Sequence, residues 1–260
     1  MSNVQGDPLI SGVVPLSTID WPGKISVVVF MSGCNMRCPW CQNPDCVLGG
    51  VKMEIEEVLR TIERSIPMID AIILSGGEPT LHPQECFEIL KFGKKLGLLG
   101  ALETNGTQPE VLREILPYLD FLAVDVKAPI SDPNLYSLVA GGVQVDTGKI
   151  VESLKIAMDS GIELEPRTTI VPGLNDNETI VERICRDLHE IGVRKLRLTQ
   201  FRNERTLDPE FQKIQPPSRE KLIKLAQIAH HLKIDVCIFT AERGLEKFHE
   251  SKFSSAIAFR

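Results

Sequence analysis

The chain has 260 residues, of which 43% are hydrophobic and 25% are charged. Its 29 basic and 35 acidic residues leave a net charge of −6, which argues against a surface that coats nucleic acid. No apolar run reaches the roughly 18 residues that cross a bilayer, and the first ten residues lack the basic and apolar regions of a secretory signal. We therefore expect a cytoplasmic protein with neither a membrane nor a nucleic-acid partner.

Strand-like apolar runs alternate with segments of helical periodicity. The first strong strand covers 25–31 (ISVVVFM), and such a nearly continuous, β-branched run is typical of a buried parallel strand. The other predicted strands cover 71–74, 98–103, 121–126, 163–171, 194–201 and 235–239. The predicted helices cover 53–65, 84–96, 109–116, 148–160, 177–191 and 218–232.

This strict alternation indicates βα units and a parallel sheet. Six main units with a seventh strand near the end favour an incomplete (β/α)6 barrel, TIM-like but open, over a closed eight-stranded one. We expect a single domain over 1–260, with a core at about 20–205 and a C-terminal helix and strand extension at about 206–260. The segment 129–147 carries the richest loop signal, with Asp-Pro and Gly-Gly pairs.

Four of the seven cysteines lie close together, directly after the first strand. Cys34, Cys38 and Cys41 form C-x3-C-x2-C, and three thiolates on one loop suit three irons of a [4Fe–4S] cluster, with the fourth iron left open. The end of a strand is also where barrel active sites are built. A structural zinc site is the alternative, with Cys46 as a fourth thiolate, although such sites usually contain paired C-x2-C knuckles. The sequence leaves the role of Cys46 open.

A second motif, SGGEPT at 75–80, directly follows the second predicted strand. Its two glycines, Gly76 and Gly77, carry no side chains, so a ligand can approach the backbone closely. Glu78 adds a carboxylate at the same strand end. Taken alone, the motif also fits an ordinary turn. Its place one βα unit after the cysteine loop favours a shared binding site.

The two motifs together resemble the radical S-adenosylmethionine (SAM) superfamily, which has C-x3-C-x2-C with an aromatic residue before the last cysteine, followed by G-G-E. The resemblance implies an incomplete barrel of the radical SAM type, with one [4Fe–4S] cluster and SAM as cofactors. In that family the open iron binds the amino and carboxylate groups of SAM. It follows that Gly76 and Gly77 would bind the methionyl part by backbone, and that Glu78 would shape the site.

The resemblance extends along nearly the whole chain. Segments 14–23 (VPLSTIDWPG) and 41–44 (CQNP) resemble the activating enzymes of glycyl-radical enzymes, most closely the activating proteins of anaerobic ribonucleoside-triphosphate reductase. The family's D-T-N-G reads E-T-N-G here at 103–106, and its D-[LV]-K reads D-V-K at 125–127. The further SAM-binding residues that this implies are Thr104, Asn105, Asp125, Lys127 and Arg167.

Side-chain chemistry agrees with these assignments. Lys127 and Arg167 are cations suited to the carboxylate and ribose oxygens of SAM, and Asp125 can accept from hydroxyls or balance Lys127. Each residue alone also fits an ion pair or a turn cap. Glu103 in place of the usual Asp leaves any cation site with Asp125 in doubt, and Arg202 stands where the family has a histidine.

The resemblance implies an activase that takes a hydrogen atom from a glycine of a partner glycyl-radical enzyme. Anaerobic ribonucleotide reductase is one candidate partner, and flavodoxin or ferredoxin is a candidate one-electron donor. We expect no residue of this chain to act as an acid, base or nucleophile. Two alternatives stay open, namely a radical SAM enzyme for a small molecule or peptide, like the deazapurine synthases, and a metal-binding scaffold without activity.

Overall fold

The computed structural model of the protein describes residues 9–49 and 53–248. One nine-stranded sheet runs through them in the order β1 to β9, so neighbouring strands in the sheet are also neighbours in the chain. The strands are β1 (Ile10–Ser17), β2 (Ser26–Met31), β3 (Ala71–Gly76), β4 (Leu99–Thr104), β5 (Phe121–Asp125), β6 (Glu163–Ile170), β7 (Lys195–Gln200), β8 (Asp235–Thr240) and β9 (Gly244–Lys247).

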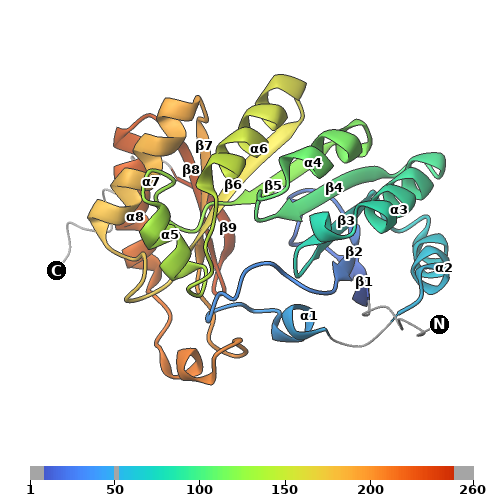
Figure 1. Ribbon diagram of the computed structural model, residues 1–260, viewed down its shortest axis with the longest axis horizontal. Helices are drawn as coiled ribbons and strands as arrows, with labels where there is room; N and C mark the ends of the chain where they lie inside the picture. Colours follow the sequence, from blue (N-terminus) through green and yellow to red (C-terminus); the bar gives the residue numbers. More distant parts are fainter. Residues whose placement is uncertain (1–8, 50–52, 249–260) are drawn as a thin grey trace.

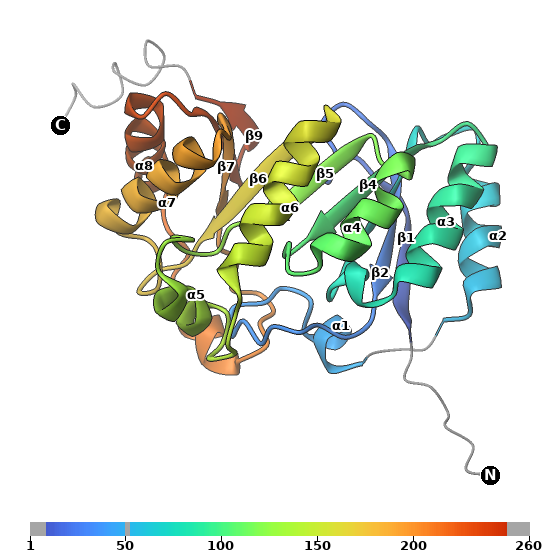
Figure 2. The same ribbon diagram turned by 45° about the horizontal axis from the view of Figure 1, so that its top comes forward.

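Strands β2 to β8 are parallel, while β1 and β9 pair antiparallel at the two edges. Six helices join the parallel strands and line the outer side of the sheet (Figures 1 and 2). They are α2 (Ile55–Ser65), α3 (Pro83–Lys95), α4 (Pro109–Ile115), α6 (Thr147–Ser160), α7 (Glu178–Ile191) and α8 (Arg219–His231). Because β1 and β9 stand at opposite ends of the strand order, the described sheet is open. The expected incomplete barrel is confirmed.

Local chemistry sets the ends of these helices. The Asn177 side chain accepts a hydrogen bond from the Ile180 N–H at the start of α7, and Ser218 accepts one from the Lys221 N–H at the start of α8. Helix α7 ends at Gly192, where the positive φ suits glycine. These six helices and all seven parallel strands lie within two residues of their predicted positions.

Two α-helices and two strands of the described chain were not predicted, and both of the helices lie near the cysteine loop. Segment 129–147 is not one loop, because it contains α5 (Pro133–Val139). Asp132 caps this helix by accepting from the Leu135 N–H at 3.0 Å, and proline fits the first helical position. The sequence interpretation took this cap and proline for a turn. Helix α1 (Pro44–Leu48) and the edge strands β1 and β9 are the other three.

The inner face of the sheet changes from apolar to polar along its strands. Ile73, Ala101 and Ala123 belong to a buried inner cluster that Trp21 joins, its ring stacked on Phe121 at 5.0 Å. Two residues further along β3, β4 and β5, the same face carries Ser75, Glu103 and Asp125, since alternate strand residues share a face. The apolar part closes one end of the barrel, and the polar part forms the wall of a pocket at the other.

Candidate functional site

The carboxyl ends of β3 to β6 and the loop after β2 enclose a pocket of about 190 Å³. All three predicted cluster cysteines line it. So do seven of the eight predicted SAM contacts, namely Gly76, Gly77, Thr104, Asn105, Asp125, Lys127 and Arg167. The remaining one, Glu78, lies behind the wall. A larger hollow of about 620 Å³ lies on the outer surface along α3 and contains none of the predicted site residues.

The three thiols of the loop share a largely buried environment. Burial raises the pKa of Cys34 to about 12 and that of Cys38 to about 11, and it raises the pKa of Cys41 as well. The positive charge of Lys127 opposes this rise at all three cysteines. Since a metal binds the thiolate and not the thiol, Lys127 favours the ligand form of the whole loop.

Three thiols on one loop suit a [4Fe–4S] cluster, in which each thiolate binds its own iron. Cys46 lies in α1 and is not part of the pocket lining.

The Gly-Gly turn packs closely against β2 and the cysteine loop. A Cβ on Gly77 would overlap the carbonyl of Gly33, and a Cβ on Gly76 would overlap the backbone of Met31. The Gly77 N–H donates to the Met31 carbonyl at 2.9 Å, and the Glu78 N–H donates to the Gly33 carbonyl at 2.8 Å. The missing side chains therefore make room for β2 and the cysteine loop, while another surface of the turn faces the pocket.

Glu78 is fully buried, and its carboxylate holds the end of β4. One oxygen accepts from the Thr104 hydroxyl at 2.7 Å and from the Thr80 N–H at 3.0 Å. The other oxygen accepts from the Asn105 N–H at 2.7 Å. Burial raises the pKa of Glu78, and these hydrogen bonds oppose that rise. Glu78 thus shapes the wall of the pocket from behind.

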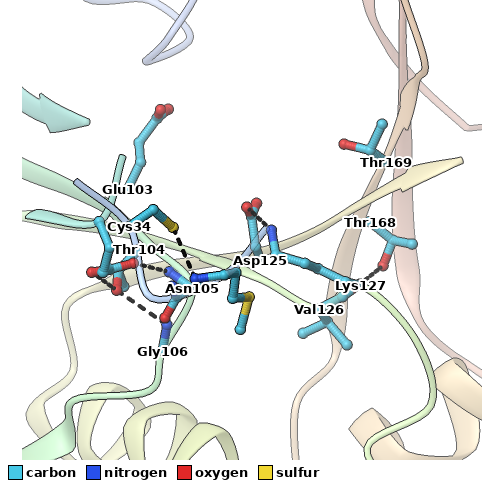
Figure 3. Close-up of polar contacts among 12 residues, drawn as sticks. Cys34, Glu103, Thr104, Asn105, Gly106, Asp125, Val126, Lys127, Thr168 and Thr169 are labelled. Atoms are coloured by element: carbon cyan, nitrogen blue, oxygen red, sulfur yellow. Dashed lines mark hydrogen bonds and ion pairs between the residues drawn. The ribbon is translucent and has the colours of Figure 1, made fainter. Parts of the chain in front are cut away.

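Asp125 and Lys127 form an ion pair inside the pocket, with 2.6 Å between carboxylate oxygen and Nζ. Figure 3 shows this pair with Cys34, Thr104 and Asn105 in the same region. Burial alone would lower the pKa of Lys127, but the Asp125 carboxylate and the Cys38 thiolate outweigh burial and raise it. The Lys127 ammonium also lies 5.2 Å from the centre of the Trp40 ring. A permanent, buried positive charge therefore faces the site.

Arg167 already has protein partners for all three of its nitrogens. Its Nη1 pairs with Glu103, its Nε donates to Glu165 at 2.7 Å, and its Nη2 donates to the Asp20 carbonyl at 2.9 Å. The second oxygen of Glu103 accepts from Ser75 at 2.7 Å. Glu103 is thus paired with Arg167, and Asp125 is paired with Lys127.

The segment after β7 contacts the far end of the cysteine loop through its backbone. The Leu207 N–H donates to the Cys41 carbonyl at 3.1 Å, and the Asp208 N–H donates to the Pro39 carbonyl at 2.9 Å. The Arg202 carbonyl accepts from the Gln42 amide at 2.5 Å. The Arg202 side chain is 53% exposed and points to Glu204, so it takes no part in the pocket.

Residues 28–184, more than half of the chain, match the model of the radical SAM superfamily. The chain belongs to this superfamily. Its cysteine loop and G-G-E turn are the motifs that indicated the family from the sequence, and the expected [4Fe–4S] cluster and SAM are the cofactors of radical SAM chemistry. No helix in the described part of the chain has the length and apolarity to cross a membrane.

Two relatives that match over nearly their whole length are named as activating enzymes. A Methanocaldococcus jannaschii protein, provisionally named a glycyl-radical enzyme activating enzyme, is 34% identical, over 92% of this chain and 98% of its own length. The pyruvate formate-lyase-activating enzyme of Clostridium pasteurianum is 29% identical, over 86% of this chain and 97% of its own. A radical SAM methyltransferase structure from Sphaerobacter thermophilus has a TM-score of 0.67 at 17% identity, covering 84% of this chain and 67% of that one. This last likeness concerns the fold alone.

Several residues that support this radical SAM pocket were not predicted from the sequence. Glu165 holds Arg167 together with Glu103, and Glu165 lies two residues before Arg167 on the same face of β6. That spacing of opposite charges was a usable signal. Asn35 and Tyr136 carried no comparable signal, because their partners are far away in the sequence.

Proposed function

We propose that this chain activates a glycyl-radical enzyme by radical SAM chemistry. One observation carries the proposal: a single pocket brings together the three cysteines of the loop and the polar ends of four neighbouring strands. The chain also spans nearly the full length of relatives named as activating enzymes. When bound, a reduced [4Fe–4S] cluster supplies an electron that splits SAM into methionine and a 5′-deoxyadenosyl radical, which can take a hydrogen atom from glycine.

The residues around the pocket divide this work. Cys34, Cys38 and Cys41 hold three irons, and the positive charge of Lys127 offsets the thiolates around it. Lys127 is also the cation that meets the SAM carboxylate. The Asp125 side chain, 46% exposed, is available to ribose hydroxyls. These contacts orient SAM before any electron arrives.

The wall residues complete the site. Gly76 and Gly77 present their backbone to the methionyl group, while Thr104, Asn105 and Glu78 support the strand end beside it. Arg167 lines the pocket, and its bonds to Glu103, Glu165 and the Asp20 carbonyl use three of its five N–H groups, so we keep it among the proposed SAM contacts. Trp40, 7% exposed, donates its indole N–H to the Val139 carbonyl at 3.2 Å and helps to keep water from the loop.

We also propose that the chain works as a single domain in the cytosol. The continuous sheet supports one domain, because β8 and β9 of the C-terminal extension belong to it. All seven cysteines are free, as in a reducing compartment. Flavodoxin or ferredoxin remains the candidate electron donor, and anaerobic ribonucleotide reductase a candidate partner.

The test combines the reconstituted, reduced protein with SAM and the glycyl-radical enzymes of the same organism, one at a time. A glycine-centred EPR doublet and one 5′-deoxyadenosine per radical are expected with one of them. The matched control is the Cys38→Ala variant, which should give neither. If no such enzyme gives a doublet while a purine-like small molecule is turned over, the activase proposal is wrong.

A further inference from the structure

Three side chains beside the pocket form a closed ring of hydrogen bonds. Asn35 Nδ2 donates to Thr107 Oγ1 at 2.7 Å, Thr107 Oγ1 donates to Asn105 Oδ1 at 2.7 Å, and Asn105 Nδ2 donates back to Asn35 Oδ1 at 2.8 Å. Each member both donates and accepts, so each bond polarises the next. We refer to Asn35, Thr107 and Asn105 as the amide ring.

The amide ring joins the cysteine loop to the pocket wall. Asn35 directly follows Cys34, whereas Asn105 directly follows β4 and lines the pocket. Asn105 and Thr107 are 5% and 8% exposed, so water competes little for these bonds. The backbone of Asn105 is itself fixed by the buried Glu78 carboxylate. The ring therefore attaches the loop to a wall that is already rigid.

A purely local explanation does not account for Asn35. The turn at 105–107 closes without it, because Asn105 Oδ1 also accepts from the Thr107 N–H at 3.1 Å. What Asn35 adds is the connection across to the loop. Only a side chain with both a donor and an acceptor can complete that connection, and an amide of this length provides both.

We propose that Asn35 is a positioning residue, which sets the place of the Cys34 thiolate, and hence of the cluster, relative to the SAM-binding wall of the pocket. This inference rests on the proposed role of Cys34 as a cluster ligand. SAM has to meet the open iron and the wall at the same time, so a small shift of the loop weakens both contacts. Neither Asn35 nor Thr107 lines the pocket, so these two residues act only through Asn105 and the cysteine loop.

The test opens the amide ring at Thr107, away from the cysteines. Thr107→Val keeps the shape of the side chain but removes the hydroxyl, and Thr107→Ser is the matched control that keeps it. Both reconstituted proteins are titrated with SAM while the EPR g-values of the reduced cluster and its midpoint potential are followed. We expect unchanged iron content in both. The apparent Kd for SAM should rise about five- to tenfold in Thr107→Val, which removes two bonds of the ring, and less than about twofold in Thr107→Ser.

A double-mutant cycle separates positioning from plain stability. The single variant Asn35→Leu and the double variant Asn35→Leu/Thr107→Val should weaken SAM binding about as much as Thr107→Val alone, because each of them opens the same ring. If only the melting temperature of the metal-free protein falls, with SAM affinity and g-values unchanged, the ring is merely structural and the proposal is wrong. Additive effects on SAM affinity would also overturn it. If Thr107→Val does not fold, Asn35→Leu decides by the same readouts.

A failure of the cluster assignment would look different. Cys34→Ala should lose the cluster whatever the ring does. If it keeps a full complement of iron with SAM-sensitive g-values, the assignment of Cys34 fails, and the inference about Asn35 fails with it.

Discussion

The two ends of the cysteine loop are held in different ways. Around Cys34, side-chain bonds are added to the backbone bond between Glu78 and Gly33, namely those of the amide ring and that of the His82 ring nitrogen on the Ser32 carbonyl at 2.5 Å. Around Cys38 and Cys41 they come mostly from backbone. The Arg37 N–H donates to the Ala140 carbonyl at 2.9 Å, and the segment after β7 donates to two carbonyls of the loop.

This difference predicts how each end responds to substitution. Backbone bonds persist through most side-chain changes, so the Cys38–Cys41 end should tolerate variation except where a Cβ cannot fit. Side-chain bonds depend on residue type, so the Cys34 end should respond to single conservative changes. The Cys38–Cys41 end holds the loop in place, while the Cys34 end sets its orientation relative to the SAM-binding wall.

The largest effect should come from the ligands themselves. Cys34→Ala, Cys38→Ala and Cys41→Ala should each lose the SAM-responsive cluster, because each removes one iron ligand in the pocket. Cys46→Ala is the matched control and should keep it, since Cys46 lies outside the lining. Iron and sulfide content, with EPR of the reduced protein with and without SAM, provide the measurement. Loss of the cluster in Cys46→Ala would instead favour a closed site of four thiolates.

The Cys38–Cys41 end, which backbone bonds hold, should be most sensitive to substitution at Gly141. This glycine has a φ of +92°, and a Cβ there would overlap the Arg37 carbonyl. We expect Gly141→Ala to destabilise the metal-free protein by more than roughly 3 kcal/mol and to lower its iron content. Gly142→Ala is the control, with a φ of +77° but open space around its Cβ, and should cost about 1–2 kcal/mol. Urea unfolding measures both, and equal losses would show that the contact with Arg37 does not matter.

Substitution of Tyr136 tests whether α5 also positions the SAM-binding wall. Its buried hydroxyl donates to the Asp125 carbonyl at 3.1 Å and accepts from the Lys127 N–H at 3.2 Å. Tyr136→Phe leaves both backbone groups without this partner, which should cost about 1–3 kcal/mol and weaken SAM binding. Tyr118→Phe, on the outer face where the ring meets Phe87 edge-on, should change stability by less than about 0.5 kcal/mol. Unaltered SAM affinity in Tyr136→Phe would confine α5 to a structural role.

The smallest effect is a dependence on pH in the metal-free protein. Burial raises the pKa of Cys34 to about 12 from an ordinary value of 9.0, so folding favours the protonated thiol. This contribution is complete below the pKa of the unfolded chain and is lost as the pH rises toward the folded value. Wild type should therefore lose stability relative to Cys34→Ala between about pH 8 and pH 10.5, by at most about 1.4 kcal/mol per pH unit. If the free energy of unfolding changes equally with pH in the two proteins across that range, the burial of this thiol is contradicted.

The sequence by itself was enough for the frame of the molecule. Hydrophobic periodicity placed every parallel strand and the six helices on the outer side of the sheet, because each buries a face that repeats locally. The cysteine spacing and the G-G-E turn indicated the family, since the chemistry needs those residues close together in the chain. The predicted site residues reached one pocket because parallel strands end at the same edge of the sheet.

Only the tertiary structure decided what most of these residues touch. Gly77 makes room for Gly33, Arg167 is occupied by acids from two strands, and Asn35 bonds to residues about 70 positions away. Such contacts depend on how separate units pack, and no local pattern records them. The wrong expectation of one long loop at 129–147 has a local cause, because an aspartate followed by proline suits both a turn and a helix cap. In the folded protein, the end of α5 packs against the cysteine loop, where the Val139 and Ala140 carbonyls accept hydrogen bonds from Trp40 and Arg37.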